Sequence, residues 1–231
     1  MSGAEQQGAD HLRAEQGEER RADRMADQLF DGRTVLCDGA MGTMLYACGV
    51  FINRSYDELN LTQPDTVRSV HEQYLQAGAQ VIETNTFGAN AVRLEHYGLG
   101  PQVRELNLAG ALLARRSVEA HRERHGAEAF VAGAVGSLGV PVGTGEGALS
   151  PDRARAVFAE QMTALAEGGV DLLIAETMMS LPEAEQALFA AREVAPQLPV
   201  AVLVKVDDDG NCLDGTPVSY THLTLPTIYS V

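Results

Sequence analysis

Short apolar runs alternate with longer amphipathic segments over most of this chain. The apolar runs are continuous, which is typical of strands that are buried on both faces of a parallel sheet. The segments between them have helix signals: Pro64 begins one, Ser150 and Pro151 begin another, and Gly78 ends the first. We therefore expect strands at residues 35–37, 81–84, 130–135, 172–175 and 200–204, and helices at 65–77, 103–121, 151–167 and 181–194.

Five strand–helix units in succession indicate an α/β fold, either a doubly wound sheet or part of a (β/α)8 barrel. No GxGxxG motif follows the first predicted strand, which weakens the case for a dinucleotide-binding sheet. A complete TIM-type barrel takes ~250 residues. The alternating region is shorter than that, so we expect about the first five βα units of such a barrel.

Polar or small residues lie at the end of three of the predicted strands or directly after it. The motifs are DGAMGT at 38–43, ETNTFG at 83–88 and ETMM at 176–179. In an α/β barrel the strands carry such residues to one rim, where the active site lies. This pattern favours the barrel over the doubly wound sheet.

The two ends of the chain differ from its middle. Residues 1–24 are charged and poor in aromatic residues, so we expect a disordered polar tail before a domain at 25–217. Residues 218–231 break the composition of the preceding chain, and 218–227 read like an in-frame translation of a transposon-type sequencing adaptor. We expect 218–231 to be a non-native tail; a genuine β-rich segment is the alternative.

Charge and composition exclude several classes of partner. The formal net charge of −15 argues against nucleic acid, because phosphate binding needs clustered Lys and Arg. No apolar run approaches the ~18 residues of a membrane span, and the N-terminus lacks the apolar region of a signal peptide. The three cysteines show no CxxC pairing. We therefore expect a cytoplasmic protein without a nucleic-acid or membrane partner.

The motifs together resemble the homocysteine S-methyltransferase family. Besides the first two motifs above, the resemblance rests on ELNLTQP at 58–64, AGAQVI at 77–82, AGAVG at 132–136, Glu176-Thr177 and DGNCLDGT at 209–216. It covers residues 29–217 and is strongest to the N-terminal half of bacterial bifunctional homocysteine S-methyltransferase/methylenetetrahydrofolate reductases. The homocysteine module of cobalamin-dependent methionine synthase is the alternative.

The resemblance implies a zinc-dependent (β/α)8 barrel that transfers a methyl group to the thiol of homocysteine and gives methionine. The methyl donor stays open among methyltetrahydrofolate, S-methylmethionine and methylcobalamin. FAD is implied as well if a reductase domain follows in the parent protein.

Homocysteine presents an ammonium group, a carboxylate and a thiol. Asp38 and Glu176 are candidates for the ammonium, and backbone N–H groups of the first motif are candidates for the carboxylate. Each candidate also has a purely structural alternative. Asp38 could cap a helix or brace a loop, and Glu176 could form a salt bridge at the rim. The segment 39–42 could be a tight turn that needs glycine, and residues 84–86 could cap their strand. The predicted substrate-binding residues are Asp38, Gly39, Ala40, Met41, Gly42, Thr84, Asn85, Thr86 and Glu176.

In the family that the motifs resemble, the zinc ligands are three cysteines: one in Asn-Cys after the sixth strand and two in Gly-Gly-Cys-Cys after the eighth. Neither segment occurs in this chain. Asn211-Cys212 imitates the first, but its surroundings match the loop after the fifth strand, so we assign Cys212 no metal role. We expect these residues to bind no zinc and to be inactive alone, and we identify no catalytic residue among them.

Two other functions stay open. An open α/β sheet that binds an amino acid or a protein partner without catalysis is one. A metal-free aldolase or lyase is the other; its Schiff-base lysine would be Lys205, the only Lys in the chain. We also expect poor solubility, because an unclosed barrel leaves a strand edge exposed.

Overall fold

The computed structural model describes residues 32, 34–51 and 53–220. The predicted polar tail at 1–24 lies outside these residues, as do residues 221–231 of the predicted non-native segment. In the part described, no helix is long and apolar enough to cross a membrane.

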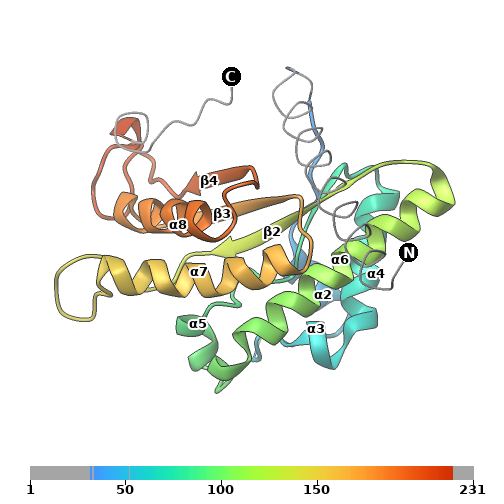
Figure 1. Ribbon diagram of the computed structural model, residues 1–231, viewed down its shortest axis with the longest axis horizontal. Helices are drawn as coiled ribbons and strands as arrows, with labels where there is room; N and C mark the ends of the chain where they lie inside the picture. Colours follow the sequence, from blue (N-terminus) through green and yellow to red (C-terminus); the bar gives the residue numbers. More distant parts are fainter. Residues whose placement is uncertain (1–31, 33, 52, 221–231) are drawn as a thin grey trace, which may run out of the picture.

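Four parallel strands form one sheet, and each pairs with the next along the chain (Figure 1). This sequential order is that of a (β/α)8 barrel; in a doubly wound sheet the strand order reverses part-way. The sheet does not close into a barrel within the described ranges. The strands are β1 (Val81–Glu83), β2 (Phe130–Gly136), β3 (Leu172–Met178) and β4 (Val200–Val204).

The helices connect the strands and cover one face of the sheet, with α4, α6, α7 and α8 in succession (Figure 1). The residues that face them from the strands share one large apolar core with the helices. The helices are α2 (Met41–Ala47), α3 (Leu59–Thr62), α4 (Pro64–Gln76), α5 (Ala91–Glu95), α6 (Val103–His125), α7 (Pro151–Glu167) and α8 (Leu181–Val194), with 3-10 turns at η1 (Gly100–Gln102) and η2 (Val218–Tyr220).

The helix boundaries follow the capping signals of the sequence. The Ser150 side chain accepts a hydrogen bond from the Arg153 N–H at 3.3 Å, which is the N-cap expected for α7. Helix α6 runs four residues beyond its predicted end at residue 121. It stops where Gly126 takes a left-handed conformation with φ 68°, a common helix end that favours glycine.

The predicted first strand at 35–37 is not a strand. It makes one parallel bridge, Cys37 to Val81, and the N–H of Asp38 donates to the Val81 carbonyl at 2.9 Å. Strand β1 has only three residues, so the ladder between the two segments stays too short for a fifth strand. The expectation of five βα units is therefore not confirmed, but the bridge still places Asp38 beside β1.

Burial on both faces holds for β2 and not for β4. All seven residues of β2 are buried. Along β4 burial alternates: Val200, Val202 and Val204 pack toward the helices, and Leu203 is 50% exposed. The prediction for β4 was wrong because this strand is the edge of the described sheet, and no described element covers the face opposite the helices.

Candidate functional site

A pocket of about 510 Å³ lies at the carboxyl ends of the strands. Drug-sized ligands occupy pockets of ~300–1,000 Å³, so the volume suits a small substrate and a co-substrate. Every residue predicted to bind substrate lies in its wall. The lining residues are Asp38, Gly39, Ala40, Met41, Gly42, Arg54, Ser55, Tyr56, Asp57, Glu83, Thr84, Asn85, Thr86, Phe87, Gly88, Arg93, Tyr97, Ala134 and Glu176.

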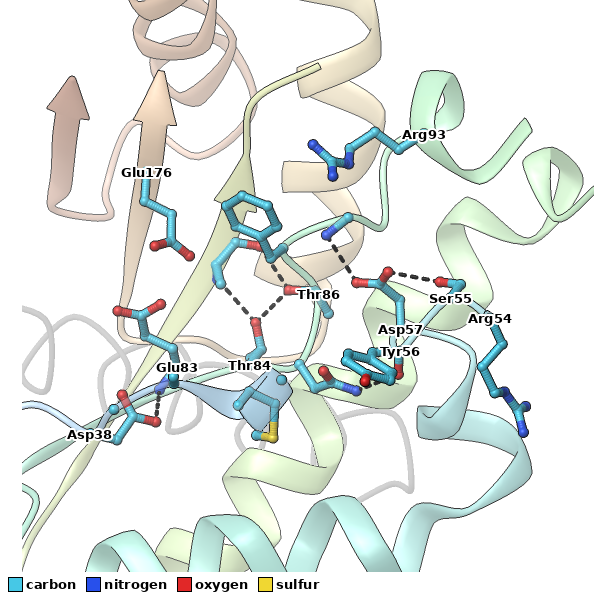
Figure 2. A pocket seen from close by; sticks show the side chains of 18 of the residues that line it. Asp38, Arg54, Ser55, Tyr56, Asp57, Glu83, Thr84, Thr86, Arg93 and Glu176 are labelled. Atoms are coloured by element: carbon cyan, nitrogen blue, oxygen red, sulfur yellow. Dashed lines mark hydrogen bonds between the residues drawn. The ribbon is translucent and has the colours of Figure 1, made fainter. Parts of the chain in front are cut away.

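One end of the pocket is acidic. The carboxyl groups of Asp38, Glu83 and Glu176 gather there from the segment before α2, from β1 and from β3 (Figure 2). One oxygen of Asp38, Oδ2, accepts a hydrogen bond from the Glu83 N–H at 2.9 Å. Within the described ranges, no Lys, Arg or His forms an ion pair with any of the three. The cluster therefore lacks a counter-cation there.

Burial shifts the titration of all three acids. It raises the pKa of Asp38 from 3.8 to about 7. The pKa of Glu176 rises from 4.5 to about 7, first through burial and then through the negative charge of Glu83. Burial also raises the pKa of Glu83. Near neutral pH the cluster is thus partly protonated, and a bound cation would favour its ionised form.

Unpaired backbone N–H groups lie next to the acidic end. Those of Gly39, Ala40, Met41 and Gly42 donate to no partner that the structure describes. The Tyr74 hydroxyl holds this segment by donating to the Ala40 carbonyl at 3.1 Å. A row of N–H groups without a described partner, three of them on the small residues Gly39, Ala40 and Gly42, is a binding place for an anion such as a carboxylate.

The structural alternatives for the two acids have different outcomes. Asp38 braces the loop through its bond to Glu83, and it does not cap α2, whose N-cap residue is Ala40. Glu176 forms no rim salt bridge with the described residues.

Thr84 and Thr86 line the pocket, but their hydroxyl groups are occupied by internal bonds. The two hydroxyl oxygens lie 2.6 Å apart. The Ala134 N–H donates to the hydroxyl of Thr84 at 3.0 Å, and the hydroxyl of Thr86 donates to the Ala134 carbonyl at 2.8 Å. These threonines therefore tie the end of β1 to β2 and shape the pocket wall, which is the strand-capping alternative.

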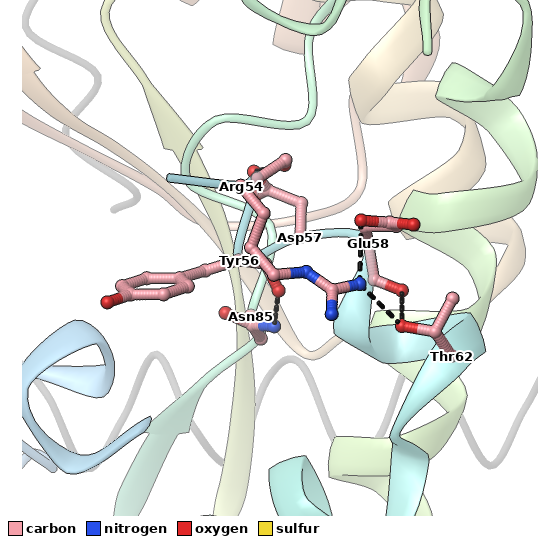
Figure 3. Close-up of polar contacts among 7 residues, drawn as sticks. Arg54, Tyr56, Asp57, Glu58, Thr62 and Asn85 are labelled. Carbon is pink, nitrogen blue, oxygen red and sulfur yellow. Dashed lines mark hydrogen bonds and ion pairs between the residues drawn. The ribbon is translucent and has the colours of Figure 1, made fainter. Parts of the chain in front are cut away.

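Asn85 is occupied in the same way. Its side-chain amide donates to the Tyr56 carbonyl at 2.8 Å (Figure 3) and to Oδ1 of Asn60 at 3.1 Å. Asn60 in turn donates to the carbonyls of Asn85 and Leu106 at 2.8 and 3.1 Å. The loop after β1 is thus fixed to α3 and α6 by buried amides.

Close packing of α6 against this loop depends on Gly110. A Cβ at this position would lie 2.6 Å from Cγ2 of Thr86 and 2.7 Å from Nδ2 of Asn60. Both neighbours are buried and hydrogen-bonded, so they have little room to move.

Sequence reasoning missed two parts of the pocket. Glu83 is the first residue of the second motif and lies near the end of the predicted strand 81–84, a signal that was sufficient to find it. The segment 54–57 has no helix or strand pattern. It reaches the pocket because the buried Asp57 accepts hydrogen bonds from Ser55 Oγ at 2.8 Å and from the Gly88 N–H at 3.0 Å.

Two arginines line the pocket away from the acidic end. The Arg54 guanidinium donates hydrogen bonds to the Glu58 carboxylate at 2.7 Å and to the hydroxyl oxygen of Thr62 at 3.1 Å (Figure 3). Arg93 lies over the Phe87 ring, 5.3 Å from its centroid, and donates to the Ser137 carbonyl at 3.2 Å. These two arginines are therefore separate from the acidic end, and the Arg54 charge is paired with Glu58.

The described residues do not fit a zinc site. No group of three or more His, Cys, Asp or Glu side chains among them is arranged to hold a metal ion. Burial, followed by the charges of nearby carboxyl groups, raises the pKa of Cys37 and of Cys212, which disfavours the thiolate form that binds zinc. Cys212 is buried in a loop, where its N–H donates to the Thr216 carbonyl at 2.8 Å.

Comparison with known sequences gives one family. The profile described as homocysteine S-methyltransferase matches residues 35–225. The chain is 30% identical over 200 residues to a methionine synthase of Mycobacterium leprae (strain TN) and 30% identical over 202 residues to one of Mycobacterium tuberculosis (strain ATCC 25618 / H37Rv). Each match covers 80% of this chain and 16% of the relative. The chain thus spans about one sixth of the length of these curated relatives.

Solved structures give a similar fold. The metallated form of the homocysteine methyltransferase MmuM from Escherichia coli matches with a TM-score of 0.73 and 29% identity, over 83% of this chain and 70% of that one. Its oxidised form matches with a TM-score of 0.74 and 28% identity, over 84% and 70%.

Proposed function

The chain belongs to the homocysteine S-methyltransferase family, and from this premise we propose that its pocket binds homocysteine as the acceptor of a methyl group in the formation of methionine. One observation supports this most directly. The pocket holds a cluster of carboxyl groups without a described counter-cation, next to a row of backbone N–H groups that donate to no described partner. These two features complement the ammonium and carboxylate groups of an α-amino acid.

In this proposal, Asp38 and Glu176 bind the ammonium group. Their carboxyl groups line the same end of the pocket, and charge-assisted hydrogen bonds to an ammonium are stronger than neutral ones. The substrate carboxylate accepts from backbone N–H groups in the segment 39–42. Thr84, Asn85 and Thr86 keep the wall in shape through the internal bonds that occupy them.

The thiol of homocysteine has to lose its proton to become a good nucleophile. In this family a zinc ion promotes that loss, but the described residues offer no donor set for zinc. We therefore assign them the binding and orientation of the amino acid and no part in activating its thiol.

The parent protein is the second part of the proposal. The resemblance of the motifs supports a homocysteine S-methyltransferase barrel, with about its first five βα units in this chain. The similarity to mycobacterial methionine synthases equally supports the homocysteine-binding module of a methionine synthase. In both cases the methyl donor is the second partner, and the cytoplasm is the proposed location.

Binding tests on the 231-residue chain examine the proposal. Homocysteine would be compared by NMR titration with 4-mercaptobutanoate, which lacks the amino group, and with 3-mercaptopropylamine, which lacks the carboxylate. We expect homocysteine to bind at least about tenfold more tightly than either, since each analogue loses a charge-assisted contact of ~1.5–3 kcal/mol.

The variant Asp38→Asn should bind homocysteine more weakly and lose most of its preference over 4-mercaptobutanoate. Glu167→Gln is the matched control, because its carboxylate pairs with Arg104 on an exposed surface. Equal binding of homocysteine and 4-mercaptobutanoate by the unaltered chain would refute the proposal.

A further inference from the structure

Glu83 has no role in the proposed recognition of homocysteine, yet its carboxyl group faces that of Glu176 (Figure 2). The two residues stand on β1 and β3, which are not neighbours, because β2 lies between them. Glu83 is in register with Ala132 of β2, and Glu176 is in register with Gly136.

The residues of β2 between the two glutamates are small. Ala132 packs with Val81 and Ile174 on the inner face of the sheet, which is the face opposite the helices. Ala134 lies in the pocket wall. Neither side chain reaches far above the sheet, so the glutamates meet over this strand and form a hydrogen-bonded pair. A larger residue in β2 at this level would separate them.

Among the described residues, the titratable groups that act on the pair are acidic or neutral, and Lys205, which follows β4, forms no ion pair with either glutamate. Asp38 and Cys37 come from the bridged segment before α2, and Tyr74 comes from α4. The facing part of β2 contributes alanine and glycine only. With no described cation beside them, two carboxylates in hydrogen-bonding contact repel each other, and the arrangement favours one proton held between them.

We propose that Glu83 is a further substrate-positioning residue, which shares one proton with Glu176 over β2 and couples binding of the substrate ammonium to release of that proton. The inference rests on the proposed binding of homocysteine. The balance is simple: the ammonium enters with its positive charge, the shared proton leaves to solvent, and Glu83 and Glu176 both remain as carboxylates around the cation.

The shared proton makes affinity depend on pH. Below about pH 7 the pair holds its proton and Asp38 is partly protonated as well, so the association constant should rise by between about one and two log units per pH unit. Above that pH the pair is already ionised in the free protein, so the association constant of homocysteine should no longer change with pH. The ammonium of homocysteine keeps its charge throughout, because free α-amino groups titrate well above this range in amino acids.

The experiment measures the dissociation constant of homocysteine for the 231-residue chain by NMR titration between pH 5 and pH 8. For Glu83→Gln we expect the level region to begin at a lower pH and the rise below it to become shallower, because the neutral amide no longer repels the Glu176 carboxylate while Asp38 still titrates. Glu167→Gln, at an exposed ion pair with Arg104, should keep the original profile. A residue with only a structural role would change the affinity at every pH alike.

A second variant protects the test against a folding defect in the first. Glu83→Asp keeps the charge, but its shorter side chain does not span β2, so its profile should also move to lower pH. An unaltered profile in both variants, or a flat profile in the unaltered chain, would overturn the role of Glu83 and leave homocysteine binding intact. Absence of homocysteine binding at every pH would overturn the proposed function, and the role of Glu83 with it.

Discussion

The carboxyl group of Glu176 is held partly out of water, so the stability of the fold should depend on its protonation. Its pKa rises from 4.5 to about 7 on folding, first because of burial and then because of Glu83. An acid with a raised folded pKa binds its proton more tightly in the folded state. Its contribution therefore favours the fold below the unfolded pKa and is lost as pH rises toward 7.

The variant Glu176→Gln removes this dependence. We expect the free energy of unfolding, measured by urea denaturation, to fall less between pH 5 and pH 7.5 in the variant than in the unaltered chain. His71, whose pKa burial lowers to about 4, adds a dependence of opposite sign, but it cancels in the comparison because both proteins contain it. Equal pH dependence in the two proteins would contradict the assigned burial of Glu176.

Asn60 is the residue on which the loop after β1 depends most. Its buried side chain makes two donated hydrogen bonds and accepts a third from Asn85. Asn60→Ala removes these three buried hydrogen bonds, so we expect the free energy of unfolding to fall by about 2–3 kcal/mol. The exposed Asn53, changed to Ala, should stay within about 0.5 kcal/mol. Similar losses in both variants would refute the bracing role.

The residues of the pocket were predictable where the chain gives a local signal. Asp38 and Glu176 each follow an apolar run, and both reach the pocket as that position predicts. The internal bonds of Thr84 and Thr86 were weighed only as an alternative, because their partner is the backbone of Ala134, about 50 residues away in sequence. Contacts of that separation follow from the packing of the sheet and leave no periodic pattern.

At the scale of elements, a buried ion pair joins α6 to the beginning of β2 and β3. The guanidinium nitrogen Nη2 of Arg115 lies 2.9 Å from Asp171 Oδ2. The same oxygen also accepts a hydrogen bond from the Val131 N–H at 2.7 Å. Removing one member of a buried pair leaves the other charge uncompensated. The pair therefore fixes the helix to the amino-terminal edge of the sheet.

We expect Asp171→Ala to lower the free energy of unfolding by about 3–5 kcal/mol in urea denaturation. The comparison is Glu167→Ala, which removes the exposed ion pair with Arg104 and should cost about 0–1 kcal/mol. If the two substitutions lower the free energy of unfolding equally, burial does not decide the strength of these ion pairs.

The elements themselves were predictable to different degrees. Helix α7 begins as its N-cap signal indicates, and β2 coincides with an apolar run, whereas β3 continues through Glu176 and Thr177 to Met178, beyond its predicted end at residue 175. The segment 35–37 has the composition of a strand, but pairing needs a partner of sufficient length, and β1 provides three residues. Burial of β4 depends equally on what lies beside it, which its own sequence does not contain.

At the scale of the whole molecule, the inner face of β4 is open to solvent. Leu203 is 50% exposed on the face opposite the helices, at the edge of the described sheet. Exposed apolar strands at a sheet edge promote association between chains. If the chain is poorly soluble, as its sequence predicts, the exposed face and edge of β4 are the surface that we expect to cause it.

We expect the 231-residue chain to associate with rising concentration in sedimentation velocity, and Leu203→Thr to reduce this association. Leu112→Thr, on the exposed side of α6, is the control and should leave association unchanged. A purely monomeric chain at all concentrations would show that the edge of β4 is not an association surface.

The central claim is that one pocket recognises both charged groups of homocysteine, and a crystal structure of the 231-residue chain with homocysteine tests it most directly. We predict the ammonium nitrogen within about 2.7–3.2 Å of a carboxyl oxygen of Asp38 or Glu176, with the carboxylate on the N–H groups of residues 39–42. Homocysteine bound outside this pocket, or with its two charged ends reversed, would contradict the account.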